Sequence, residues 1–234
     1  MTAFGARSIP RCNAMKIIYS DADIAVCIKP AGVLSEGSVG DASSMIGLIA
    51  QALGTDKVFP VHRLDRETGG LMVYALNESS AAALSRAIAE HKLEKKYVAL
   101  TVGKPEPECG EMQDLLYYDR KRNKSFTVKK ERKGVKAASL SYETLEFCEK
   151  ANVSRVLVTL HTGRTHQIRV QFASRKLPLC GDRKYGAPAE YGNSLKLTSV
   201  FLSFPSPKSG EILTFELEEK NNCEFFEKPF TIGN

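Results

Sequence analysis

Residues 61–76 read VHRLDRETGGLMVYAL and join a polar turn to an uninterrupted apolar run. Leu71 to Leu76 has the length and composition of a buried strand. Asp65 precedes it, flanked by Arg63 and Arg66, whose positive charges favour an ionised carboxylate. The paired glycines at 69–70 permit positive φ and a close approach to the backbone. We therefore predict a buried strand with a carboxylate at its entrance. A structural ion pair at a turn is the alternative interpretation.

The remaining pattern predicts more strands than helices, without βαβ alternation. Helices are expected at 41–53, capped by Asp41 or Ser43, at 77–93, and at 165–174, where Thr165 is the candidate N-cap. Residues 126–128 and 138–147 flank Arg132-Lys133-Gly134 and predict a hairpin arm. The other strands are expected at 17–19, 24–28, 96–102, 155–161, 197–204 and 213–217. The fold class is α+β with a mixed, mostly antiparallel sheet.

The 234 residues contain no apolar run near the roughly 20 residues that span a bilayer. The first sixteen residues also lack the apolar core of a signal peptide, so a cytoplasmic location without membrane contact is expected. The six cysteines occur singly, without metal-binding spacing, and are interpreted as free thiols in a reducing compartment. No metal site is predicted.

The net charge of +6 is distributed unevenly. Residues 120–136 hold nine Lys or Arg and one Glu, whereas the other 217 residues have a net charge of −2. A second basic stretch, 164–184, has a net charge of +5, and residues 211–227 have a net charge of −5. Separate clusters of one sign are typical of polyanion-binding proteins, although a solvated basic hairpin is the alternative.

Two further segments are polar where the pattern predicts burial. KKYVA at 95–99 places Tyr97 on a strand beside two lysines, either as packing or as a platform for a nucleobase with Lys95 or Lys96 facing phosphate. LHTGRTHQIRVQF at 160–172 predicts a strand, a turn and a helix carrying Arg164 and Arg169. Two arginines there suit an anion or a buried carboxylate. The two histidines of this segment do not have a metal-binding spacing.

Taken together, these segments resemble the RluA family of RNA pseudouridine synthases. The resemblance rests on KPAG at 29–32, HRLDRETGGLMVYA at 62–75, KKYVAL at 95–100, GRTHQIRVQFAS at 163–174 and PLCGDRKYG at 178–186. It extends from about residue 16 to residue 217. In LSFP at 202–205, Phe204 replaces the usual histidine of the family.

The resemblance implies a pseudouridine synthase fold with flanking helices and a central catalytic cleft, and isomerisation of uridine in RNA without cofactor or metal. By the same resemblance, Asp65 is the catalytic aspartate, Tyr97 stacks on the target base, and Arg169 pairs with Asp65. Arg63 is implied to occupy the space that the flipped base leaves, or to hold the backbone. Leu64 and the turn formed by Thr68, Gly69 and Gly70 are expected to shape the pocket.

RNA, as tRNA or large-subunit (23S-type) rRNA, is the expected partner of a monomer. Its phosphates are expected to contact basic side chains around the cleft and on the arm at 120–136, namely Arg63, Arg66, Lys95, Lys96, Arg120, Lys121, Arg122, Lys129, Lys130, Arg132, Lys133, Arg164, Arg183 and Lys184. Residues 1–15 are predicted to form an extension without an S4 domain, 16–220 the catalytic domain, and 221–234 a tail.

Two other functions compete with RNA isomerisation. A non-catalytic RNA-binding or folding factor on the same domain has no need of a buried carboxylate beside phosphates. A glycoside hydrolase needs two carboxylates across the scissile bond, and Glu67 is the only acid close to Asp65 in sequence.

Overall fold

The computed structural model describes residues 15–217. The predicted tail at 221–234, and all but the last residue of the predicted extension at 1–15, lie outside the described residues. Within the described range, Cys27, Cys109 and Cys148 are free thiols, as predicted. No helix in the same range is long and apolar enough to cross a membrane.

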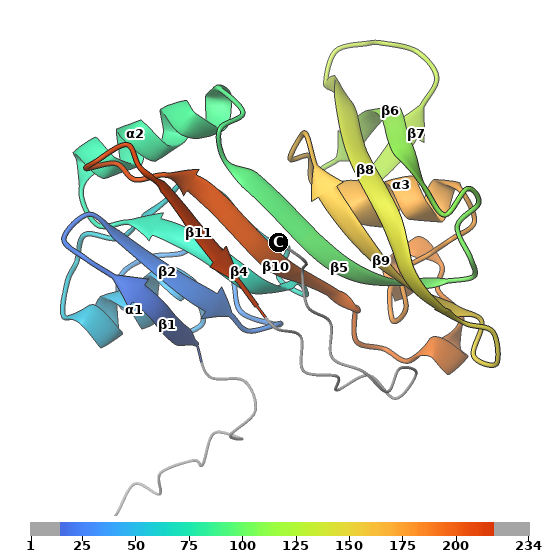
Figure 1. Cartoon of the computed structure of the whole chain (residues 1–234), viewed down its shortest axis with the longest axis horizontal. Coiled ribbons are helices and arrows are strands. Elements are labelled where there is room, and N and C mark those ends of the chain that lie inside the picture. Colours follow the sequence, from blue (N-terminus) through green and yellow to red (C-terminus); the bar gives the residue numbers. More distant parts are fainter. Residues whose placement is uncertain (1–14, 218–234) are drawn as a thin grey trace, which may run out of the picture.

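Eleven strands form one sheet in the order β1-β2-β4-β10-β5-β9-β8-β6-β7, with β11 added to β10 and β3 to β4 (Figure 1). Every pairing is antiparallel except that of β4 with β10, which confirms the mixed, mostly antiparallel prediction. The strands are β1 Lys16–Ser20, β2 Ile24–Lys29, β3 Phe59–Pro60, β4 Gly69–Ala75, β5 Glu94–Val102, β6 Cys109–Asp119, β7 Lys124–Val128, β8 Val135–Cys148, β9 Val153–Leu160, β10 Leu197–Pro205 and β11 Ile212–Glu216.

The parallel contact between β4 and β10 explains one of the paired glycines. Thr198 and Ser199 of β10 lie opposite Gly69 and Gly70. Gly70 has φ +110°, and a Cβ there would lie 2.1 Å from the carbonyl oxygen of Ser199. Beyond Ser199, β10 leaves β4 and pairs with β11 instead. The predicted close approach at Gly70 is therefore an approach of the sheet's own backbone.

Three helices flank the sheet: α1 Met45–Leu53, α2 Glu78–Ala89 and α3 Gln167–Ser174. Helix α1 begins later than predicted because the side chain of Ser44, rather than of Asp41 or Ser43, accepts the capping hydrogen bond from the N–H of Gly47. Asn77 caps α2 as expected from its predicted start. Thr165 does not cap α3, because the N-cap is His166 in the left-handed region with no side-chain hydrogen bond to the helix.

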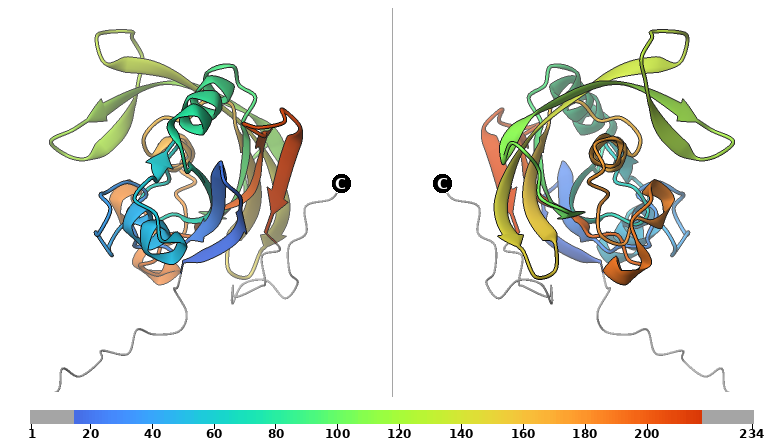
Figure 2. Two further views of the ribbon diagram at one scale, coloured as in Figure 1. Left: turned by 90° about the vertical axis from the view of Figure 1, so that its left-hand side faces the viewer. Right: turned by 90° about the vertical axis from the view of Figure 1, so that its right-hand side faces the viewer.

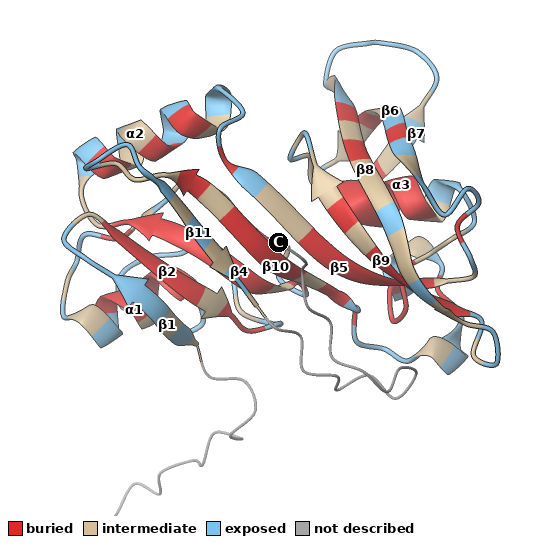
Figure 3. Ribbon diagram, viewed as in Figure 1, coloured by how far each residue is buried: buried red, intermediate tan, exposed pale blue. Residues whose placement is uncertain are grey.

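The central strands of the sheet are buried, and β2, β4, β10 and much of β5 are red in Figure 3. Alternate residues of β2 point to opposite sides, so Ala25 and Cys27 join the core that α1 and α3 cover, whereas Ile24 and Val26 join the core beneath α2. Phe204, in place of the family's histidine, is fully buried in the second core and stacks on Phe215. The central strands are thereby fixed from both sides.

The predicted hairpin around Arg132-Lys133-Gly134 is wrong in its strand pairing. Strands β7 and β8 follow each other in sequence, but β6 lies between them and pairs with both. The true hairpin is β6–β7, with residues 120–123 as its turn. It projects from the body of the molecule as the yellow-green arm of Figure 2. We call β6, β7 and the connection at 129–134 the basic arm.

Candidate active site

Asp65 lies in a tight turn between β3 and β4. The N–H of Thr68 donates to the carbonyl of Asp65 at 3.0 Å and closes the turn. Ser35 fixes the preceding residue, since its hydroxyl donates to the carbonyl of Leu64 at 2.8 Å and accepts from its N–H at 3.0 Å. On the other side, the N–H of Gly32 donates to the carbonyl of Arg66 at 2.7 Å. The loop after β2 therefore holds the backbone of the turn at both ends.

Lys29 stabilises the same loop from inside. Its side chain is buried, and Nζ donates to the carbonyls of Pro30, Val33 and Arg66 at 2.9, 2.7 and 3.1 Å. Burial lowers the pKa of Lys29 to about 8, although the negative charge of Asp65 opposes the shift. The lysine of the KPAG motif thus joins the two loops and adds a positive charge beneath the turn.

Tyr97 lies on the central strand β5, opposite Ser199 of β10 and Val158 of β9. Only 4% of the residue is exposed. Burial raises the pKa of its phenol, and the charge of Asp65 raises it further. Because the charge of Asp65 acts on this phenol, Tyr97 belongs to the same site as Asp65, and its hydroxyl is neutral.

The turn before α3 is organised by Gln167. Its Oε1 accepts from the hydroxyl of Thr162 at 2.8 Å and from the N–H of Arg164 at 3.0 Å. Its Nε2 donates to the carbonyl of Ser139 on β8 at 3.0 Å. Because this side chain satisfies the polar groups of the turn, the helix begins without a capping hydroxyl.

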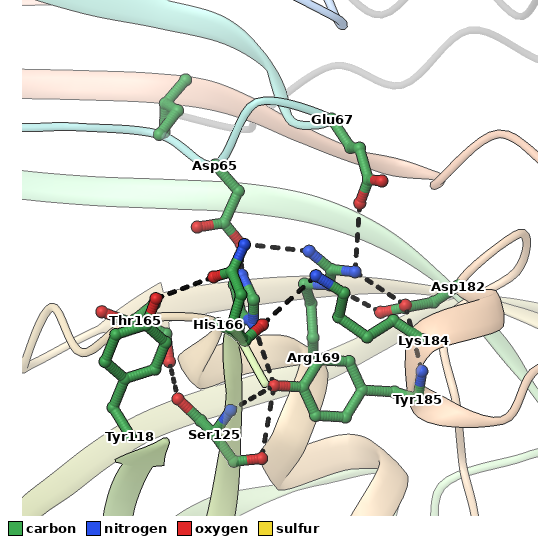
Figure 4. A network of polar contacts seen from close by, with 12 residues as sticks. Asp65, Glu67, Tyr118, Ser125, Thr165, His166, Arg169, Asp182, Lys184 and Tyr185 are labelled. Carbon is green, nitrogen blue, oxygen red and sulfur yellow. Dashed lines mark hydrogen bonds and ion pairs between the residues drawn. The ribbon is translucent and has the colours of Figure 1, made fainter. Parts of the chain in front are cut away.

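Arg169 projects from α3 toward three carboxylates (Figure 4). Nε and Nη2 bind Asp182 in a two-point contact of 2.7 and 2.8 Å, Nη1 lies 3.4 Å from Asp65, and Nη2 lies 3.1 Å from Glu67. Burial acts to lower the pKa of Arg169, but the hydrogen bonds and charge of Asp182, with the charges of Asp65 and Glu67, raise it above its ordinary value. The predicted pair with Asp65 is present, but the shortest contacts of the guanidinium are with Asp182.

Asp65 is engaged on one side only. Arg169 and His166 both approach Oδ2, at 3.4 and 3.9 Å. In residues 15–217, no hydrogen bond or ion pair involves Oδ1, which points away from Arg169 in Figure 4. One oxygen is thus held while the other remains available.

A cavity of about 970 Å³ opens in front of this carboxylate. Of the residues predicted to shape the pocket, Leu64 and Thr68 line it, whereas Gly69 and Gly70 serve the contact with β10 instead. The titratable side chains in its wall include Asp65, Tyr97, Arg169, His166, Lys95, His62, His91, Glu94 and His161.

Three of the predicted RNA-binding side chains, Arg63, Lys95 and Arg164, also line the cavity. Arg63 lies at the exposed rim, 3.7 Å from Glu36. Lys95 is two residues from Tyr97 on β5, and burial lowers its pKa. Arg164 is tethered, since its Nε donates to the carbonyl of Ala137 at 2.9 Å.

Two other predicted contacts are placed differently. Lys96 does not line the cavity, because it lies opposite Phe201 on β10 and its Nζ is 4.5 Å from the centre of that ring. Of the two lysines predicted to face phosphate, Lys95 is therefore the one on the cavity side. Arg66 turns back to its own loop, where Nε donates to the carbonyl of Gly32 at 2.9 Å.

The remaining predicted contacts are exposed and surround the basic arm. Arg132 stacks over Tyr117 at 4.9 Å, and Nζ of Lys184 donates to the carbonyl of Asn123 at 3.2 Å. The 3-10 helices η1 Arg183–Tyr185 and η2 Ala189–Tyr191 follow α3 in the chain. The exposed set on the arm and η1 comprises Arg120, Lys121, Arg122, Lys129, Lys130, Arg132, Lys133, Arg183 and Lys184.

Four polar residues of the site had no functional assignment from the sequence: Lys29, His62, His166 and Asp182. Nε2 of His62 accepts the N–H of Val73 at 3.1 Å, and burial, with the charge of Lys95, lowers its pKa to about 3. Asp182 is the only acid in the basic stretch 164–184. This isolation among cations was the sequence feature that could have indicated an ion pair with Arg169. Among the described residues, no group of three or more His, Cys, Asp or Glu is arranged to hold a metal.

Comparisons of this chain with known proteins by family model, by sequence and by structure agree with one another. Residues 23–174 match the family model described as RNA pseudouridylate synthase. An uncharacterised RNA pseudouridine synthase of Aquifex aeolicus is 37% identical over 90% of this chain and 71% of its own length. The dual-specificity RNA pseudouridine synthase RluA of Salmonella typhimurium is 32% identical over 86% of this chain and 91% of its own. The solved structure of human RNA pseudouridylate synthase domain containing 1 has a TM-score of 0.75 and 21% identity, and covers 91% of this chain and 86% of that protein.

Proposed function

Because the chain belongs to the RluA family of RNA pseudouridine synthases, isomerases that act on RNA, we propose that it converts specific uridines of a structured tRNA or large-subunit rRNA to pseudouridine in the cytoplasm. The observation that carries the proposal is the half-engaged carboxylate of Asp65 facing the cavity beside Tyr97.

The target uridine has to leave its stack to reach Asp65, because a base inside a helix is not accessible to the bottom of a cavity. In the reaction, the N1–C1′ bond breaks, the uracil rotates while bound, and C5 bonds to C1′ with loss of the C5 proton. Asp65 either attacks C1′ or accepts a sugar proton, and both roles require an ionised carboxylate with a free oxygen. Oδ1 meets this requirement while Oδ2 is oriented by Arg169.

Arg169 and Tyr97 complete the site. The guanidinium offsets the cost of holding a partly buried negative charge, since an unpaired carboxylate in an apolar pocket is unstable. The ring of Tyr97 holds the detached uracil in the plane in which it turns. Because the raised pKa keeps the phenol protonated, it helps to remove the C5 proton only as a relay: its oxygen takes that proton while its own hydroxyl proton passes to the carboxylate of Asp65, the base beside it.

The exposed charges of the basic arm, with Arg63, Lys95 and Arg164 around the cavity, provide the phosphate contacts. Phosphate contacts fix position rather than sequence. Structured RNA is recognised through its shape and its splayed bases, so a cavity flanked by a projecting cationic arm suits a folded loop.

The competing functions fit the site less well. A non-catalytic RNA-binding or folding factor leaves the Asp65 and Tyr97 pair without a purpose. A glycoside hydrolase needs a second carboxylate facing the scissile bond. Glu67 is 57% exposed, contacts Arg169 and does not line the cavity. Glu94 does line it, but its side chain is about half exposed and pairs with Lys96 at 3.4 Å.

The decisive experiment is a pseudouridine map of RNA from cells that lack the gene, complemented by wild type or by Asp65→Asn. We expect at least one site to disappear on deletion, and to return with the wild type alone. A map that deletion leaves unchanged, or that Asp65→Asn restores, would exclude catalysis by this carboxylate.

Glu67→Gln is the matched control. It removes a carboxylate two residues away that contacts the same guanidinium but lies outside the cavity. We expect it to restore the map, because Glu67, unlike Asp65, does not line the cavity. Equal loss in both variants would mean that neutralising any acid near Arg169 is damaging.

A further inference from the structure

His166 occupies an unusual position at the start of α3. Its backbone lies in the left-handed region, with φ 54°, although it is not a glycine. This conformation directs the side chain into the cavity wall, where Nε2 lies 3.9 Å from Oδ2 of Asp65. Non-glycine residues in this region are uncommon, and Asn tolerates it best. Because the backbone alone would suit Asn better than His, we look for the role of His166 in its imidazole ring.

The opposite ring nitrogen is held by Tyr185 of η1. Nδ1 lies 2.9 Å from the Tyr185 hydroxyl, which also accepts the N–H of Ser125 at 2.8 Å. Burial raises the pKa of Tyr185 to about 12, so the phenol keeps its proton. The hydroxyl proton has two candidate acceptors, Nδ1 at 2.9 Å and the carbonyl of Ser125 at 3.3 Å. The shorter contact is with Nδ1, and a proton donated there favours the neutral tautomer with hydrogen on Nε2.

The charges facing His166 come from each element packed against it. Burial lowers the pKa of the imidazole, Asp65 opposes the shift, Arg169 and Lys184 reinforce it, and Asp182 opposes it. Tyr118 of β6 contributes only a ring edge, with centroids 6.4 Å apart. The net direction is a pKa below 6.5, so the imidazole is neutral at pH 7.

We propose that His166 is a positioning residue for Asp65, whose Nε2–H, set by the hydroxyl of Tyr185, holds Oδ2 so that Oδ1 faces the sugar of the target uridine. The proposal rests on the proposed function. At 3.9 Å the contact is loose, and we expect the carboxylate to close it when a nucleotide fills the cavity, as catalytic hydrogen bonds commonly do on substrate binding.

The same contacts connect the basic arm to the site. Ser125 belongs to β7, and its hydroxyl donates to the carbonyl of Thr165, the residue before His166. Beside it, Nζ of Lys124 donates to the carbonyl of Lys184. Direct hydrogen bonds therefore join strand β7 of the arm to the segments that carry Tyr185 and His166.

The test compares two amides that imitate opposite ring nitrogens. Gln places its amide nitrogen near the position of Nε2, whereas Asn places it near Nδ1 and cannot reach Asp65. If His166 mattered only for its backbone, Asn would be the better replacement, because it tolerates positive φ. If the Nε2–H matters, Gln is better in spite of its backbone.

The assay is single-turnover release of tritium from RNA labelled at C5 of uridine and isolated from cells lacking the gene, with saturating enzyme. We expect His166→Asn to slow release by about 10- to 100-fold, the range of loss for a misplaced reacting group, and His166→Gln to recover most of it. An Asn variant as fast as wild type, or faster than Gln, would refute the proposal. A wild type that releases no tritium would instead overturn the proposed function.

Tyr185→Phe supplies the second measurement. In the wild-type background it removes the group that sets the tautomer, and we expect a loss of several-fold. In the His166→Gln background we expect no further loss, because the amide has no tautomer to set. Equal losses in both backgrounds would show that Tyr185 acts only by holding the fold, and would remove it from the proposal.

The pH dependence separates orientation from general damage. In the wild type, His166 gains a proton as the pH falls through its lowered pKa. The second positive charge then makes the carboxylate of Asp65 a weaker nucleophile and base, so we expect the rate to fall as the pH falls. In His166→Gln, the part of this fall that the imidazole causes should be absent. Identical profiles in the two proteins would contradict the proposed contact.

Discussion

The buried pair of Arg169 and Asp182 offers the sharpest test of the site, because its contributions to stability and to catalysis can be separated. The side chains are 2% and 0% exposed and share a two-point contact. Arg169→Met leaves Asp182 without its cation. Breaking a buried pair from one side costs about 3–5 kcal/mol. For a domain of this size, each kcal/mol corresponds to about 2–4 °C, so we expect a fall in melting temperature of about 6–20 °C.

Adding Asp182→Asn to Arg169→Met should recover part of that loss. The second substitution removes the unpaired charge but keeps an acceptor for the N–H of Tyr185, which bonds to Asp182 at 3.3 Å. What remains is a buried amide without a full set of partners, a cost of about 1–3 kcal/mol. The double variant is therefore expected to be more stable than the single variant by roughly 2 kcal/mol.

Turnover should behave differently from stability. Arg169 is also the cation that lies 3.4 Å from Asp65, and neither variant retains it. We expect both to be inactive in tritium release, at a temperature where circular dichroism shows each to be folded. A double variant that regains turnover would refute the role of Arg169 at Asp65. A single variant as stable as wild type would refute the buried pair.

Three further outcomes follow from the geometry. Tyr97→Phe, which keeps the ring and removes the hydroxyl, should slow tritium release by about 100-fold or more with unchanged RNA affinity in a filter assay, and an unchanged rate would exclude the hydroxyl from the proton transfer. Lys29→Met leaves the carbonyls of Pro30 and Val33 without their donor and should lower the free energy of unfolding in urea by about 2–4 kcal/mol; equal stability would show that the lysine does not hold the turn. Replacing four arm cations by Gln, at Lys129, Lys130, Arg132 and Lys133, should reduce the slope of log affinity against log salt by about 0.7–0.9 for each phosphate that is no longer neutralised. The control replaces four exposed lysines elsewhere, at Lys57, Lys92, Lys176 and Lys208. An equal change of slope in the control would show that the arm has no special role in RNA binding.

Much of the architecture was predictable because it depends on local pattern. Apolar alternation and length place most of the strands, and the scarcity of βαβ units indicates an antiparallel sheet. The pairing of β7 was not predictable in this way. Sequence neighbours usually pair, but no strand was predicted at 109–119, so β8 was the only neighbour left for β7. The structure has β6 there, and it pairs with both. The start of α3 also differed from the prediction, because the side chain of Gln167, rather than a hydroxyl, accepts the hydrogen bonds of the turn before the helix.

The groups that we propose to react were named without any structure. Asp65, Tyr97 and Arg169 were named from motifs whose spacing does not depend on the details of folding, and the excess charge at 120–136 was visible as a count. The groups that support them became visible only once the chain was folded. Asp182 is thirteen residues from Arg169, Lys29 is 37 from the turn that it holds, and Ser125 is 60 from Tyr185. Contacts of this kind depend on how the chain returns to the same place, and no local pattern of residues encodes that distance.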